Sequence, residues 1–215
     1  MKLIEFFAGI GGFSVGFERE GFEPVAYVEI DDGCRAVLGK HRPRVPAYRD
    51  ARDLCGLPVS GLVGSWQEDR PLRLEELAAV RPDWLVVENV AHTWKRWVPE
   101  LRSRLFVAGY ASVPLQLSAF EVGAKHLRRR VFVVAHADSE QLRKLSRWWC
   151  GPGREVAKEF AESWDSAPRR LGADDGLPSW VDRRKQLGNA VCTYAAQLIA
   201  RAIKVTSDSA TAGDT

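Results

Sequence analysis

The sequence predicts an α/β fold built on a single doubly wound, mostly parallel sheet. Short apolar, β-branched runs alternate with longer amphipathic ones, as in proteins whose sheet carries helices on both faces. The run WLVV at residues 84–87 is continuously apolar, which is typical of a central parallel strand. A glycine-rich turn follows the first apolar run, as in open α/β folds that bind a ligand at the strand ends. With 215 residues and 46% hydrophobic content, the chain can bury one full core.

The alternation places each element in turn. Strands are expected at Leu3–Phe7, Pro24–Glu29, Leu57–Val63, Trp84–Glu88, Ala111–Gln116 and Val131–Ala137. Helices are expected at Phe13–Glu20, Asp31–Lys40, Leu72–Val80, Trp94–Val107 and Ala190–Lys204. Residues 138–177 mix charges, glycine, proline and two adjacent tryptophans, so neither a strand nor a helix is expected there. The small, polar residues 205–215 predict a disordered tail.

Composition narrows the class of protein. No segment is apolar for the roughly eighteen residues that a membrane helix requires, and the first residues lack the pattern of a signal peptide. We therefore expect a cytoplasmic, intracellular protein that does not associate with membranes. The four cysteines lack metal-ligand spacing, so no metal is expected. A formal charge of +3 is compatible with a nucleic-acid partner, and the densest basic run is Lys125–Arg130. The alternative for that run is a solvated face.

The first glycine-rich segment predicts a cofactor pocket. FAGIGGF at residues 7–13 follows the apolar run 3–6, and Glu29 stands about twenty residues further on, at the end of the next predicted strand. Glycines let the backbone turn tightly and approach a ligand, while a carboxylate can accept hydrogen bonds from ribose hydroxyls. The alternative is an ordinary strand-to-helix turn. A nicotinamide-type fingerprint would have glycine where Ser14 stands.

Six blocks then follow one another in order: FAGIGGFSVGFEREGF, VEID, YRD, DWLVVENV, RRRVFVV and KQLGNAV. Together they resemble the DNA (cytosine-5) methyltransferase family, from Lys2 to about Ile203. The resemblance implies a Rossmann-like, S-adenosylmethionine-dependent fold that transfers a methyl group to C5 of a cytosine flipped out of DNA. It makes 1–137 the cofactor-binding and catalytic core, 138–177 a short remnant of the target-recognition region, and 178–204 the closing helix of the methyltransferase domain.

The resemblance also implies a set of cofactor contacts. The backbone of the first block would wrap the methionine part of S-adenosylmethionine, Glu29 would hold the ribose hydroxyls and Ile30 would lie against the adenine. Asp50 would accept a hydrogen bond from the adenine amino group, and Asn189 would be a polar contact from the last block. For these two residues, a loop cap and a helix cap are alternatives. The residues implied for the first block are Phe7, Ala8, Gly9, Gly11 and Gly12.

For the substrate, the resemblance implies that Glu88 holds the target cytosine and that Arg128 and Arg130 complete the pocket. His126 replaces the glutamine of the family pattern. A carboxyl group at the N3 and amino edge of the ring can accept from the amine and protonate the ring nitrogen. Such a Glu88 would need a raised pKa, which burial at a strand end can provide. The alternative is a structural ion pair between buried Glu88 and an arginine.

One family block is missing. Relatives carry a Pro-Cys-Gln loop that holds the nucleophile, and this sequence contains no Pro-Cys-Gln. Because C5 of cytosine accepts a methyl group only after a thiolate adds at C6, the absence bears directly on activity. Three hypotheses follow: a methyltransferase that acts by unusual chemistry or with a second chain that supplies the loop or target recognition, a non-catalytic binder of S-adenosylmethionine and DNA, and, as a weaker one, a nicotinamide-dependent oxidoreductase.

Overall fold

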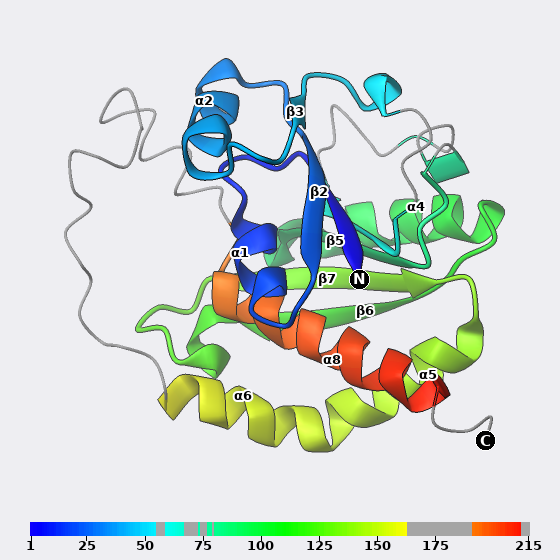
Figure 1. Cartoon of the computed structure of the whole chain (residues 1–215). Coiled ribbons are helices and arrows are strands. Elements are labelled where there is room, and N and C mark those ends of the chain that lie inside the picture. The colour runs from blue at the N-terminus through cyan, green and yellow to red at the C-terminus, as the bar shows by residue number, and fades with distance from the viewer. Residues whose placement is uncertain (55–58, 67–72, 74–76, 79, 163–190, 212–215) are drawn as a thin grey trace.

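The computed structural model describes residues 1–54, 59–66, 73, 77–78, 80–162 and 191–211 (Figure 1). Its centre is a seven-stranded sheet in the order β3-β2-β1-β4-β5-β7-β6. All neighbouring strands pair in parallel except β7, which is antiparallel to both β5 and β6. The predicted α/β class with one doubly wound, mostly parallel sheet is therefore confirmed. The strands are β1 Lys2–Phe6, β2 Glu23–Val28, β3 Ala47–Tyr48, β4 Gly61–Ser65, β5 Trp84–Val90, β6 Ala111–Ser118 and β7 Arg129–His136.

Helices cover both faces of this sheet (Figure 1). One apolar layer joins the sheet to α1, α5, α6 and α8, and the other joins it to α4. The helices are α1 Gly12–Glu18, α2 Asp32–His41, α4 Trp94–Val107, α5 Ser139–Cys150, α6 Pro152–Glu162 and α8 Thr193–Thr211, with short 3-10 turns η1 Ala51–Asp53, η2 Ala91–Thr93 and η3 Ala119–Val122. No helix among the described residues is long and apolar enough to cross a bilayer.

Helix α8 packs directly on α1, far from it in sequence. A Cβ on Gly16 would lie 2.4 Å from the carbonyl oxygen of Thr193, so only glycine permits this approach of the two helices. At the end of α1, buried Glu20 accepts a hydrogen bond from Gln197 at 2.8 Å and pairs with Arg201. The last helix therefore lies beside the first helix of the chain.

Some predicted boundaries were wrong. The fourth strand begins at Gly61 rather than Leu57 and ends at Ser65, while most of the helix expected at 72–80 lies outside the described residues. The short edge strand β3 was not expected. The predicted tail was wrong for 205–211, because α8 continues to Thr211. Thr206 is buried there, and Ser207 Oγ lies 3.2 Å from the indole nitrogen of Trp84.

The prediction of no helix in 138–177 was also wrong, since α5 and α6 occupy 139–162. The side chain of Asp138 caps α5 by accepting from the backbone N–H of Glu140 at 2.8 Å. Leu142 and Leu145, one helical turn apart, are buried in the main core, and Phe160 of α6 joins them. This stretch is therefore part of the main body over its described length. The rest of it, 163–177, lies outside the described residues.

Candidate functional site

A cavity of about 250 Å³ follows the carboxyl ends of the parallel strands. Its lining runs from Glu29 after β2, through the turn after β1 and the end of β4, to Glu88 and Asn89 on β5 and Arg130 on β7. Strand alternation puts Glu5, Ser65, Glu88 and Arg130 on the sheet face that α1 and α8 cover. The lining consists of Glu5, Phe7, Ala8, Gly9, Gly12, Phe13, Glu29, Cys34, Ser65, Trp66, Glu88, Asn89, Val90, Arg130 and Val191.

The turn after β1 is held in an unusual conformation. Phe7, Gly9 and Gly11 all have positive φ, at 52°, 54° and 83°, a region that side chains disfavour. The backbone N–H of Ala8 donates to the carbonyl of Val28 at 3.1 Å, which fixes the turn against β2. A Cβ on Gly9 would meet no atom within 4 Å, so the turn borders open space on the cavity side. Backbone groups of the turn can therefore contact a ligand directly.

Glu29 joins this turn to the residues that precede α2. One carboxylate oxygen accepts from the backbone N–H of Gly9 at 2.7 Å, and the other accepts from the N–H of Asp31 at 2.8 Å. Because a carboxylate offers about four acceptor positions, both oxygens can still accept from a bound ligand. The structure thus brings Glu29 to the cavity together with Phe7, Ala8, Gly9 and Gly12. Gly11 and Ile30 do not line it, and Ile30 is exposed.

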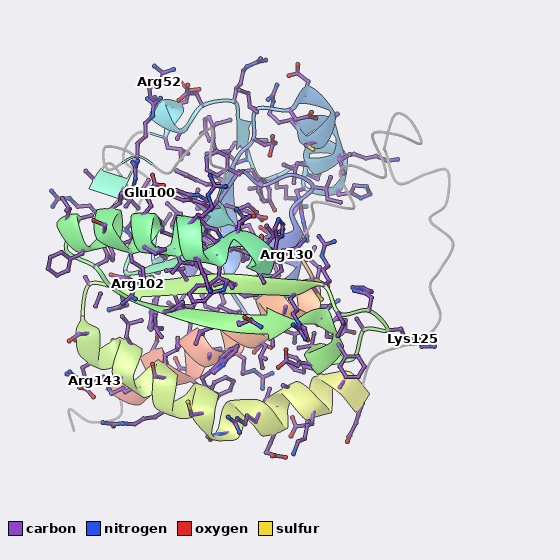
Figure 2. The ribbon with its side chains drawn as sticks, turned by 180° about the vertical axis from the view of Figure 1, so that it is seen from behind. Arg52, Glu100, Arg102, Lys125, Arg130 and Arg143 are labelled. Atoms are coloured by element: carbon purple, nitrogen blue, oxygen red, sulfur yellow. The ribbon has the colours of Figure 1, made fainter. Side chains whose placement is uncertain are left out.

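Asp50 is not brought to the cavity. Its side chain caps η1, where one oxygen accepts from the backbone N–H of Arg52 at 2.9 Å and the other pairs with the Arg52 guanidinium at 2.5 Å. These hydrogen bonds hold the pKa of Asp50 well below its usual range. Figure 2 shows Arg52 far from Arg130. The capping alternative therefore describes the observed contacts of Asp50.

Glu88 and Arg130 form a buried ion pair at the other end of the cavity. The Nε atom of Arg130 lies 2.6 Å from a carboxylate oxygen of Glu88, and their side chains are 15% and 4% exposed. Val90 pairs with Arg130 across the sheet, so the two charged residues lie diagonally on neighbouring strands. Burial raises the pKa of Glu88, while Arg130 and Arg128 oppose that rise.

Arg128 contributes to the same electrostatic environment without lining the cavity. Burial and the neighbouring charge of Arg130 lower the pKa of Arg128, and Glu88 opposes that change. Arg128 has φ of 22°, a rare value for an arginine. The predicted charged residues of the substrate pocket are thus gathered around one end of the cavity.

Glu5, which the sequence analysis did not single out, is a buried carboxyl group in the cavity wall. Its side chain accepts from the N–H groups of Phe13 and Ser14 at 3.2 and 3.0 Å and from the Ser14 hydroxyl at 2.5 Å. Burial raises its pKa to about 7, although these hydrogen bonds lower it. An acidic residue inside an otherwise apolar strand was the available signal. Glu5 fixes the start of α1 and therefore the end of the glycine turn.

Strand β4 ends at Ser65 and is followed by Trp66, at the point where the resemblance implies a nucleophile loop. Ser65 Oγ lies 3.4 Å from Glu88, a distance that gives at most a weak hydrogen bond. The Trp66 ring is buried and stacks on Trp97 at a centroid distance of 6.5 Å. Cys34 also lines the cavity, at the end near Ala8 and Glu29. Cys55 lies outside the described residues.

The start of α8 completes the wall. A Cβ on Gly12 would lie 2.9 Å from the Val191 side chain, so the glycine turn and the residues that precede α8 are in close contact. Asn189, the predicted polar contact of the last block, lies outside the described residues. Among the residues that the structure describes, no group of three or more histidine, cysteine or acidic side chains could hold a metal ion.

The chain is similar to known methyltransferases in sequence and in fold. Residues 1–55 match the family model for C-5 cytosine-specific DNA methylases. The type II methyltransferase M.FnuDI of Fusobacterium nucleatum is 30% identical over 159 residues, which cover 62% of this chain and 46% of the relative. M.HgiDI of Herpetosiphon aurantiacus is 27% identical over 168 residues, covering 63% and 52%.

The crystal structure of the Dnmt2 methyltransferase of S. pombe has the same fold, with a TM-score of 0.52 and 19% identity over 63% of this chain and 49% of that one. The chain spans about half the length of the relatives that it matches. The chain is thus similar to C-5 cytosine-specific DNA methylases over residues 1–55 and to type II methyltransferases over a longer stretch, and it shares the fold of a solved methyltransferase.

Proposed function

We propose that the chain binds S-adenosylmethionine along the glycine turn. The positive φ of Gly9 and the open space beside it expose backbone groups to a ligand, and the Glu29 carboxylate stands where it can accept from ribose hydroxyls. The residues present therefore fit this cofactor. When bound, it supplies an electrophilic methyl group. Phe7, Ala8 and Gly12 would form the wall on the methionine side, and Asn189 and Ile30 remain proposed contacts.

The second part of the proposal is that the other end of the cavity holds a cytosine base flipped out of DNA. The buried Glu88–Arg130 pair carries this proposal. A carboxyl group whose pKa is raised by burial can be protonated, so Glu88 can give a proton to N3 while its other oxygen accepts from the exocyclic amine. Arg130 would donate to the ring carbonyl oxygen. Together these contacts withdraw electrons from the ring and favour attack at C6.

Methyl transfer to C5 also needs a nucleophile at C6. This chain carries no Pro-Cys-Gln segment, and β4 ends at Ser65 and is followed by Trp66. Transfer therefore requires another nucleophile from this chain or one from a second chain. The buried indole of Trp66 in the cavity wall favours a second candidate function, in which the chain binds both ligands without transferring the methyl group.

Two assays on the same protein separate these functions. Transfer of a tritiated methyl group from S-adenosylmethionine to cytosine-containing DNA distinguishes an enzyme from a binder. Covalent trapping on DNA that carries 5-fluorocytosine reports the nucleophile, because a stable adduct requires a bond to C6. Transfer with an adduct supports the methyltransferase, whereas tight binding of both ligands without either signal supports the binder.

Glu88→Ala tests the base-binding role. We expect it to abolish transfer, or to weaken cytosine binding in a binder, while the affinity for S-adenosylmethionine is retained. Glu100→Ala is the matched control, since Glu100 lies exposed on α4 and pairs with Arg104 at 3.0 Å, away from the lining of the cavity (Figure 2). Unchanged transfer and cytosine binding in Glu88→Ala would refute the assigned role.

A further inference from the structure

The loop between β6 and β7 exposes two large apolar side chains. Phe120 is 63% exposed and Leu127 is 59% exposed. The loop, residues 119–128, also carries Lys125 and His126, and both are exposed. Large exposed apolar groups beside exposed basic groups indicate a contact with a partner that offers both apolar faces and negative charge.

This loop is held firmly in shape. Ser118 and Glu121 form a reciprocal capping box, in which the Glu121 carboxylate accepts from the Ser118 N–H at 2.6 Å and the Ser118 hydroxyl accepts from the Glu121 N–H at 3.3 Å. The N–H of Ala119 donates to the carbonyl of Leu127 at 3.1 Å, closing the loop on itself. Val122 is fully buried in the core beneath it. The exposed positions of Phe120 and Leu127 are therefore fixed by the loop's own contacts.

The loop lies at the same edge of the sheet as the cavity. Ser118 pairs with Arg129, and Arg130 pairs with Val90 at the end of β5. Arg130, which holds Glu88, is only three residues after Leu127. Figure 2 shows Lys125 at the outer end of this loop and Arg143 at the opposite end of the molecule. The loop therefore leads directly into the strand that carries Arg130 to the cavity.

Charge favours one occupant. Lys125, His126 and Arg129 are exposed, whereas Arg130 pairs with Glu88, and the carboxylate of Glu121 is engaged in the capping box. Phosphates suit these basic groups, and base faces suit an exposed aromatic ring or an apolar wedge. A nucleic-acid strand offers both at regular intervals.

We propose that loop 119–128 is a DNA-contacting surface, in which Phe120 and Leu127 pack against the bases that flank the flipped cytosine and Lys125 and Arg129 contact the phosphates. The inference rests on the proposed function of the Glu88 pocket. It adds a way for this chain to hold the strand next to the target base by apolar contact, since stacking on an aromatic side chain is independent of base sequence.

The test is the affinity of the full chain for a fluorescein-labelled DNA strand and duplex containing cytosine, measured by anisotropy over a range of salt concentrations. Phe120→Ala should weaken binding about 5- to 100-fold with an unchanged salt dependence, because it removes stacking and no charge. Leu127→Ala should weaken binding in the same direction. Lys125→Ala should lower the slope of log affinity against log salt by about 1.

Two variants serve as controls. Phe106→Ala removes a more exposed ring, at 80%, from the end of α4 at the opposite edge of the sheet, and should leave DNA binding unchanged. Arg143→Ala removes a charge from the far end of the molecule and should leave the salt slope unchanged. Equal melting temperatures would establish that all variants are folded.

The outcomes distinguish this inference from the function on which it rests. Wild-type binding to DNA with equal affinities for Phe120→Ala and Phe106→Ala would overturn the loop proposal alone. Absence of wild-type DNA binding would overturn both the DNA part of the proposed function and the loop proposal. If Phe120→Ala instead changes the sedimentation of the protein without DNA and leaves DNA binding intact, the loop is a protein interface and the proposal is wrong.

Discussion

Replacing Glu5 by glutamine should change how stability depends on pH. Burial raises the pKa of this carboxyl group from 4.5 to about 7. Between these two pH values the unfolded chain releases the proton while the folded chain retains it, so the wild type loses stability as pH rises through this window. Multiplying the rise by about 1.4 kcal/mol per pH unit gives a loss of about 3 kcal/mol, which is complete above about pH 7.

The assay is urea unfolding of the wild type and Glu5→Gln at several pH values from 4.5 to 8. Glutamine does not titrate, and other titrating groups cancel in the difference between the two proteins. The amide also exchanges one acceptor oxygen for a donor toward the N–H groups of Phe13 and Ser14, which adds a constant penalty to the variant. We expect the advantage of the wild type over the variant to shrink by about 3 kcal/mol from pH 4.5 to 7. A pH-independent difference would refute the account of Glu5 as a buried carboxyl group with a raised pKa.

Two further substitutions test the packing and the ion pair. Gly16→Ala should reduce the free energy of unfolding by about 1–3 kcal/mol, because the new Cβ would lie 2.4 Å from the Thr193 carbonyl oxygen. Gly39→Ala in α2, where a new Cβ would meet no atom within 4 Å, should be neutral or stabilising. Equal effects of the two substitutions in urea unfolding would contradict the α1–α8 contact. Arg130→Met should cost about 3–5 kcal/mol at pH 8, since it leaves Glu88 buried without its partner. The cost should fall as the pH is lowered, because burial raises the pKa of Glu88 and a protonated carboxyl group needs no cation beside it. If the loss in the free energy of unfolding is as large at low pH, Arg130 does not stabilise the fold through its ion pair with Glu88.

Much of the site could be predicted because parallel strands end at one edge. Glu29, Glu88 and the glycine turn each follow a run that reads as a strand, so their gathering follows from the topology. The rule for parallel strands does not place Arg130, because β7 runs antiparallel and its first residues, not its last, lie at that edge. The order of the sequence blocks supplied this information where periodicity did not.

Other features could not be predicted from the pattern of apolar residues. Glu5 was read as one residue of an apolar strand, although a carboxyl group inside a strand buried on both faces indicates a specific set of hydrogen bonds. The resemblance of the YRD block assigns Asp50 to the cofactor, but its side chain caps η1 and pairs with the guanidinium of Arg52. Leu142 and Leu145 mark α5, yet the charges between them concealed the helical period.

The most direct test of the account is isothermal calorimetry of the chain with S-adenosylmethionine, with NAD as the comparison and Glu29→Ala as the variant. We expect one bound S-adenosylmethionine per chain, no binding of NAD, and an affinity at least tenfold weaker in Glu29→Ala, because hydrogen bonds to a charged group contribute about 1.5–3 kcal/mol. No heat with S-adenosylmethionine, or an unchanged affinity in the variant, would contradict the assignment of the cavity to this cofactor.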